Sequence, residues 1–149
     1  RMKEFVLLFR MDITNKEAQP TQEQMAVYMQ QWMEWINEIA DNDQLADGGN
    51  HFSRQGRVLK PNNEVIEMPH IADNNSVAGY IIILADNLDE ATKIAKKCPI
   101  LNGQNTSVEI RETATPGPSR VFRDGAKSGC HRHARPGCAR AGQRSRADS

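Results

Sequence analysis

The stretch VAGYIIILADNLDEATKIAKKCPIL, residues 77–101, contains a strand followed directly by a helix. The apolar run from Val77 to Ala85 is almost continuous, which is typical of a strand buried on both faces. Asn87 with Glu90 three residues later indicates a helix start, and Pro99 ends the helix. Its predicted apolar face consists of Leu88, Ala91, Ile94, Ala95 and Cys98. Because Cys98 lies on the packed face, we expect a buried, unreactive thiol.

The residues nearer the N-terminus predict a second strand and a second, longer helix. In EFVLLFR, residues 4–10, both alternating faces are apolar, which indicates a central strand. Residues 11–20 form a connection, and Thr21 with Gln24 fits a capping box. One apolar stripe then follows at helical spacing: Met25, Tyr28, Met29, Trp32, Trp35, Ile36 and Ile39, ending at Asp41–Asp43. We interpret this stripe as core packing rather than a cofactor or ligand site.

Between these two halves, the sequence predicts a β-hairpin. After a Gly48–Gly49 turn, HFSRQGRVLKP and EVIEM are two strands joined at Pro61–Asn63. In the second strand, Ile66 and Met68 are expected to face the core and Glu67 to face away. A polar loop over 69–76 leads into the buried strand, and SVEIRE, residues 107–112, is the last strand.

This order predicts an α+β fold, a ferredoxin-like split βαβ sandwich with an antiparallel sheet and an extra hairpin. Two helices cover one face of such a sheet. Because about 115 residues leave little chain to cover the other face, we expect a homodimer that pairs through the sheet faces.

Charge divides the 149 residues into two parts. Residues 1–115 carry 11 Lys and Arg against 17 Asp and Glu, whereas residues 116–149 carry 8 against 2. The first part is the predicted domain. The second is a basic tail with too few large apolar residues to fold, so we expect disorder, and its abrupt change in composition is typical of an expression or reading-frame artefact.

The tail offers two sharper interpretations, and we favour neither. Cys130, His131, His133 and Cys138 could ligate zinc, but their spacing matches no standard finger, so no metal and no cofactor is expected. The arginines lack an aromatic platform or a folded basic face, which makes nucleic acid an unfavoured partner.

Other patterns narrow the class of protein. No apolar run approaches the roughly 20 residues that span a bilayer, and the N-terminal run is broken by Arg10 and Asp12, so it predicts a strand. A single cysteine in the domain favours a reducing cytoplasm. The sequence contains no nucleophilic triad, Gly-rich phosphate loop or helical His-x-x-x-His.

Candidate site residues cluster around the hairpin. His70 is the best candidate base, with Glu67 and Asp73 three residues to either side as candidate orienting acids. A turn near 61–63 brings together positions whose numbers sum to about 124 or 125, so Arg57 is expected opposite Glu67 or Met68, and Arg54 near His70 or Ile71. His51, Arg54 and Arg57 are the candidate ligand-binding residues. The alternative is a solvated loop histidine with ordinary surface charge pairs.

Several elements resemble the YCII-related family, in its Asp-Gly-Pro-Phe branch, over about residues 3–115. They are Gly79–Tyr80 at the start of the buried strand, the ADNLDEA helix start at 85–91, and the Lys97–Pro99 stop. The resemblance implies a dimeric α/β barrel of ferredoxin-like subunits and, in some members, a histidine and an aspartate as an acid–base pair. Where the branch has Asp-Gly-Pro-Phe, this chain has Glu67-Met68-Pro69-His70.

Two hypotheses of function follow. One is a small dimeric enzyme of lyase or isomerase type that uses His70, with Glu67 or Asp73, to move a proton on a small polar or phenolic molecule. The other is a non-catalytic dimeric ligand-binding or regulatory module that has lost the family's chemistry along with its motif.

Overall fold

The computed structural model describes residues 2–14 and 20–114. A compact unit ends at Thr113, close to the predicted domain boundary. The predicted basic tail, including Cys130, His131, His133 and Cys138, lies outside the described residues.

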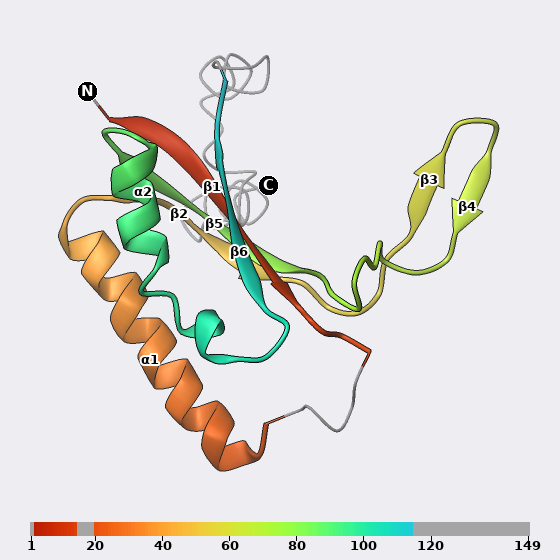
Figure 1. The fold of residues 1–149 in the computed structure, drawn as a ribbon, viewed down its shortest axis with the longest axis horizontal. Helices are drawn as coiled ribbons and strands as arrows, with labels where there is room; N and C mark the ends of the chain where they lie inside the picture. The colour runs from red at the N-terminus through yellow and green to blue at the C-terminus, as the bar shows by residue number, and fades with distance from the viewer. Residues whose placement is uncertain (1, 15–19, 115–149) are drawn as a thin grey trace, which may run out of the picture. The chain divides into compact units, whose positions relative to one another are not determined.

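Six strands, two α-helices and one 3₁₀ helix make up the described chain (Figure 1). In chain order they are β1 (Lys3–Met11), α1 (Gln22–Asp41), β2 (Leu45–His51), β3 (Val58–Lys60), β4 (Glu64–Ile66), β5 (Ser76–Ala85), α2 (Leu88–Ala95), η2 (Pro99–Asn102) and β6 (Ser107–Glu112).

The main sheet has the order β2-β5-β1-β6, and all of its pairs are antiparallel. β1 and β5, the two strands with the longest apolar runs, occupy the centre. The α+β class and the central position of β1 are confirmed, and the strand order is compatible with a ferredoxin-like fold.

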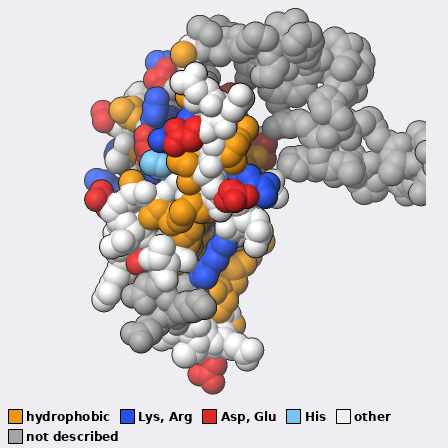
Figure 2. Space-filling model, turned by 90° about the vertical axis from the view of Figure 1, so that its right-hand side faces the viewer, with side chains coloured by type: hydrophobic (Ala, Val, Ile, Leu, Met, Phe, Trp, Pro, Cys, Tyr) orange, Lys and Arg blue, Asp and Glu red, His pale blue; other side chains and the backbone are white. Residues whose placement is uncertain are grey.

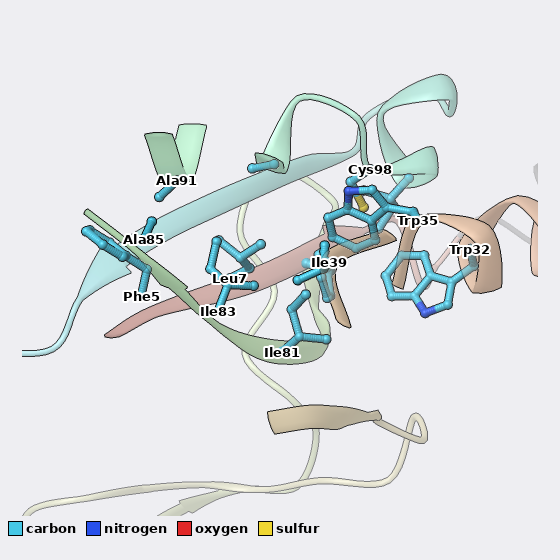
Figure 3. Close-up of a cluster of buried hydrophobic side chains, with 13 residues drawn as sticks. Phe5, Leu7, Trp32, Trp35, Ile39, Ile81, Ile83, Ala85, Ala91 and Cys98 are labelled. Carbon is cyan, nitrogen blue, oxygen red and sulfur yellow. The ribbon is translucent and has the colours of Figure 1, made fainter. Parts of the chain in front are cut away.

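The core lies between one face of this sheet and the two helices (Figure 3). Alternate residues of β1 and β5 point into it because successive side chains of a strand face opposite sides. α1 and α2 close the core from above the sheet. The buried residues are Phe5, Leu7, Phe9, Trp32, Trp35, Ile39, Ile81, Ile83, Ala85, Ala91, Ala95, Cys98 and Ile100.

Both helix starts are confirmed in detail. Thr21 and Gln24 form the reciprocal capping box, with each side chain accepting from the other residue's backbone N–H. The Asn87 Oδ1 accepts from the backbone N–H of Glu90 at 2.9 Å. The two helices are then tied together by the indole N–H of Trp35, which donates to the carbonyl of Ile94 at 3.0 Å.

The apolar stripe of α1 is only partly buried. Trp32, Trp35 and Ile39 are in the core, but Met25 and Met29 remain 41% and 39% exposed. The N-terminal half of α1 continues past the sheet (Figure 1), so these methionines have no strand beneath them. Leu88, which we expected on the packed face of α2, is also exposed because it is the first residue of that helix.

The Gly48–Gly49 turn was predicted wrongly, since both glycines lie inside β2. β2 pairs with β5 through two irregularities of register, on either side of Asp47. At Gly49 the backbone has a φ of +65°, and an added Cβ would lie 1.7 Å from the Tyr80 carbonyl oxygen. The glycines therefore form a bulge in β2 that packs against β5. In the sequence alone, the same pair of glycines predicts a turn.

The hairpin exists but is shorter than predicted and does not join the main sheet. Its strands are β3 and β4 alone, and residues 52–57 have no regular structure. The turn is correct, with Asn62 and Asn63 in the left-handed region. Ile66 and Met68 were predicted to face the core; instead the hairpin projects away from the body (Figure 1), and Met68 is exposed.

The second face of the main sheet, opposite the core, carries those residues of β1 and β5 that do not point into the core. Val6 and Leu8 of β1 lie directly opposite Ile82 and Tyr80 of β5, and all four are half-buried. We call Val6, Leu8, Tyr80, Ile82 and Leu84 the open face. Neither α1 nor α2 covers it, because both helices lie on the core side (Figure 1).

Candidate functional site

The candidate residues gather at one end of the main sheet. Met11 pairs with Ser76 and His51 pairs with Gly79, so β1 and β2 end where β5 begins. The segments 52–57 and 67–75 leave the sheet at this end and frame the hairpin. All six predicted site residues therefore lie in, or next to, these two segments.

The register of the hairpin places Arg57 opposite Glu67, one of its two expected partners. Val58 pairs with Ile66 and Lys60 with Glu64, so paired numbers sum to 124. Arg57 Nε lies 3.7 Å from Glu67 Oε1, and both side chains are largely exposed. A surface pair of this kind contributes at most about 1 kcal/mol. For the chemistry of the site, the pair matters because the Glu67 carboxylate contacts the Arg57 guanidinium and not His70.

Below this ion pair, the two segments approach each other closely. An added Cβ on Gly56 would lie 3.1 Å from Pro69 Cγ, which places residue 56 beside residue 69. Arg54 is two residues before this contact and His70 one residue after it. We call this region, with Arg54 and His70, the arm base. Within the described chain, neither side chain forms a hydrogen bond or an ion pair.

Asp73 has a conformational role in the same loop. Ala72 and Asn75 exchange backbone hydrogen bonds around Asp73 and Asn74, both of which have positive φ. Such two-residue turns favour Asp and Asn. The side-chain amide of Asn105 donates to the Asp73 carbonyl at 3.1 Å and ties the turn to the loop before β6.

The backbone at His70 is held from inside the protein. The hydroxyl of Ser76, which is 4% exposed, donates to the His70 carbonyl at 2.6 Å. The imidazole itself is exposed. No hydrogen bond joins it to Glu67 or Asp73 in the described chain, so the expected orienting acids are neighbours in sequence without being partners of the ring.

His51 lies in different surroundings. As the last residue of β2, it faces the helix side of the sheet, and its ring centroid is 5.4 Å from that of Trp32. Trp32 also contacts Phe9 and Tyr28. The stripe on α1 was interpreted as packing alone, so the sequence did not point to Trp32 as a neighbour of His51. The contact depends on two tertiary relations, the pairing of β2 with β5 and the packing of α1 against β2.

Two ionisable side chains, Cys98 in the core and Tyr28 packed against it, stay neutral at physiological pH. Burial raises the pKa of the Cys98 thiol to about 12, and the backbone hydrogen bond at Ile100 offsets part of the rise. Burial also raises the pKa of Tyr28 to about 12, with Cys98 adding to the effect. Cys98 lies beside Trp35 (Figure 3), which confirms the predicted packed thiol.

Two surface hollows of about 350 and 370 Å³ lie along α1. The first runs between α1 and the α2–η2 segment, and the ion pair of Glu38 with Lys97, at 3.2 Å, belongs to its lining. The second lies on the first turns of α1. Neither includes a predicted site residue, so the hollows and the arm base are separate features.

The residues that the structure describes contain no group of three His, Cys, Asp or Glu side chains that could hold a metal ion. None of the described helices is long and apolar enough to span a membrane. Neither a protein-family model nor a curated protein matches this chain.

Proposed function

We propose that this protein is a homodimer that binds a small anionic or phenolic molecule at the arm base, with Arg54 and His70 as its contacts. The observation that supports the proposal is the close approach of Gly56 to Pro69, which brings the segments carrying these two residues side by side. Within the described residues the guanidinium of Arg54 has no carboxylate partner, and the neighbouring segment carries an exposed imidazole, a pair of groups that suits a carboxylate or phenolate ligand.

The geometry favours binding over acid–base catalysis. A histidine that acts as a general base needs a partner that orients the ring and sets its proton affinity. Glu67 is paired with Arg57, and Asp73 forms part of a turn. Neither acid is therefore positioned to orient the His70 ring. The replacement of the Asp-Gly-Pro-Phe motif by Glu67–His70 points the same way. The non-catalytic module is therefore our preferred interpretation of the YCII-like resemblance.

The proposed homodimer rests on the open face. Its half-buried apolar residues occupy the centre of the sheet, on the side that the helices leave uncovered. A contiguous apolar surface in such a position is typical of an interface between copies. We place the dimer in the cytoplasm, since the lone Cys98 of the domain needs no oxidising compartment.

A titration followed by ¹H–¹⁵N correlation spectra tests the binding proposal. Acetate, benzoate and 4-nitrophenolate are suitable probes, and the amides of Gly56 and His70 are expected to shift. Arg54→Ala and His70→Ala should each weaken binding by about tenfold or more, the effect of losing one charge-assisted contact. Arg111→Ala is the matched control, because Arg111 is an exposed arginine already paired with Glu109.

If all three variants bind the probes as the wild type does, the site is not at the arm base. The same preparations should be assayed for proton exchange at carbon in phenolic substrates. If the wild type shows turnover and both His70→Ala and Glu67→Ala abolish it, the protein is the lyase- or isomerase-like enzyme and not a non-catalytic binding module.

A further inference from the structure

The hairpin exposes large apolar side chains to solvent. We call residues 57–68 the arm. Leu59 is 74% exposed and Val65 is 50% exposed, and these two residues pair with each other across the strands. The packing of β3 is chiefly against β4. A two-stranded hairpin in water is only marginally stable on its own, so this arm lacks the packing that would hold it in place.

Apolar residues lie on both faces of the arm. Leu59 and Val65 share one face with the ion pair of Arg57 and Glu67, while the pair of Val58 and Ile66 occupies the other. A hairpin that faces solvent on one side carries polar residues there. An element that is apolar on both sides and has unpaired strand edges is suited to lie against another surface.

The same chain provides a surface of the matching kind. The open face is apolar, and it belongs to the two central strands of the sheet. The arm projects beyond the end of its own sheet and does not fold back over this face (Figure 1). Each copy therefore has one apolar face and one apolar arm. Within the described chain the helices leave that face open, and Phe52 packs against its Tyr80, with ring centroids 5.9 Å apart.

Charge identifies a second copy as a compatible partner for these two surfaces. The arm carries Arg57, Lys60, Glu64 and Glu67, two charges of each sign. The border of the open face carries charges of both signs, with Glu109 between Arg10 and Arg111. Seen from the arm side, apolar side chains form a band bordered by both signs of charge (Figure 2).

The exposed methionines of α1 are a poorer surface for self-association. That helix contains Glu23, Glu34, Glu38 and Asp41 but no Lys or Arg. Two copies meeting through α1 would bring like charges together, which disfavours the contact. The arm and the open face have no such conflict.

We propose that the arm of one copy packs on the open face of a second copy, reciprocally about a two-fold axis. In this arrangement each copy supplies what the other lacks, as an isologous interface requires. The arm base then lies at the boundary between copies, so the partner shields Arg54 and His70 from solvent. The inference rests on the proposed homodimer and is independent of ligand identity.

Sedimentation equilibrium of a charge-neutral double variant, Leu59→Lys with Val65→Glu, is the direct test. Both positions are exposed within the chain, so the fold should be kept, as far-UV circular dichroism can verify. We expect the dimer dissociation constant to rise about 100-fold, as when a buried interface anchor is lost. The matched control is Leu88→Lys with Leu101→Glu, two exposed leucines away from the arm and the open face. It should change the constant less than about twofold.

A spin label gives a second measurement that needs no destabilising change. Leu59→Cys is labelled in a background of Cys130→Ser and Cys138→Ser, and mixed with ¹⁵N-labelled wild-type protein. Broadening of the amides of Leu8 and Ile82 is expected across the mixed dimer. Absence of that broadening in a dimeric sample would overturn the arm contact.

The two proposals can fail separately. If the Leu59→Lys/Val65→Glu variant stays dimeric but Ile82→Glu becomes monomeric, the homodimer forms through the sheet faces and the arm is not part of the interface. A wild-type protein that is monomeric at millimolar concentration removes both the homodimer and the arm contact. Probe binding at Arg54 and His70, measured on the same samples, reports on the ligand site alone.

Discussion

The body and the arm contain similar residues and differ in what surrounds them. Both have antiparallel strands rich in Val, Leu and Ile. In the body, Phe5, Leu7 and Ile83 are completely buried beneath two helices, whereas Leu59 in the arm is mostly exposed. Apolar content alone therefore does not make a strand part of a core. We expect a strand to be stable where another layer of the protein covers it. The arm should therefore be stably folded only when a second copy covers it.

The largest difference between body and arm is expected from truncation. Phe5→Ala removes a fully buried ring and should lower the free energy of unfolding by about 3–5 kcal/mol. Leu59→Ala should change it by less than about 0.5 kcal/mol when the protein is monomeric. Urea unfolding of both variants at low concentration checks this. Equal losses would mean that the arm is packed within its own chain.

The bulge in β2 gives the next largest effect. Gly49→Ala places a Cβ against the Tyr80 carbonyl at a positive φ, so a loss of about 3 kcal/mol is expected. Gly48→Ala meets nothing within 4 Å and should cost less than about 1 kcal/mol. At the arm base, Gly56→Ala meets only the Pro69 ring and should also be mild. Thermal unfolding of the three variants gives this order, and a tolerated Gly49→Ala would contradict the bulge.

Alkaline pH should destabilise the body through Cys98. Its pKa in the folded state is about 12, against 9.0 for an ordinary thiol, so the unfolded chain releases its proton first. Stability is therefore lost as the pH rises from 9 towards 12, on the order of 2 kcal/mol by pH 11. Unfolding free energies measured across this range should fall less steeply in Cys98→Ala. Parallel curves for the two proteins would show that the thiol is not buried.

Helix capping should matter less than the core. Asn87→Ala removes the acceptor for the Glu90 N–H and should cost about 1 kcal/mol. Asn87→Asp, which keeps an acceptor, is the control and should retain most of the stability. Urea unfolding separates the two, and an Asn87→Ala variant as stable as the wild type would argue against the cap.

The smallest effect is expected at the exposed ion pair of the arm. Arg57→Ala breaks the contact with Glu67 and should lower the unfolding free energy by less than about 0.5 kcal/mol. A double-mutant cycle with Glu67→Ala measures the coupling energy of the pair in the monomer. A coupling of several kcal/mol would place this pair in a buried interface even at low concentration.

The parts of the fold that were predictable from the sequence depend on local patterns. The run from Val77 to Ala85 identified the central strand, and Thr21 and Asn87 identified the helix starts. The turn at 61–63 limited the partner of Arg57 to Glu67 or Met68, because pairing in a hairpin follows from its turn, and the structure selects Glu67. Each of these features involves residues close together in the chain.

The errors concern longer-range relations. Gly48–Gly49 resembles a turn unless the backbone of β5 is known to lie beside it. Ile66 and Met68 alternate in the same way whether or not their hairpin joins a core. Met25 and Met29 continue a helical stripe past the end of the sheet that would have covered them. For the same reason, two findings required the tertiary structure: the contact of His51 with Trp32, and the lack of a carboxylate partner for His70 among the described residues.

Hydrogen exchange measured above and below the dimer dissociation constant tests the central contrast most directly. The amides of β1 and β5 should be protected equally at both concentrations, because their core lies within one chain. The amides of β3 and β4 should be protected only above the constant, when a second copy covers the arm. Arm amides that exchange at the same rate in monomer and dimer would contradict the account.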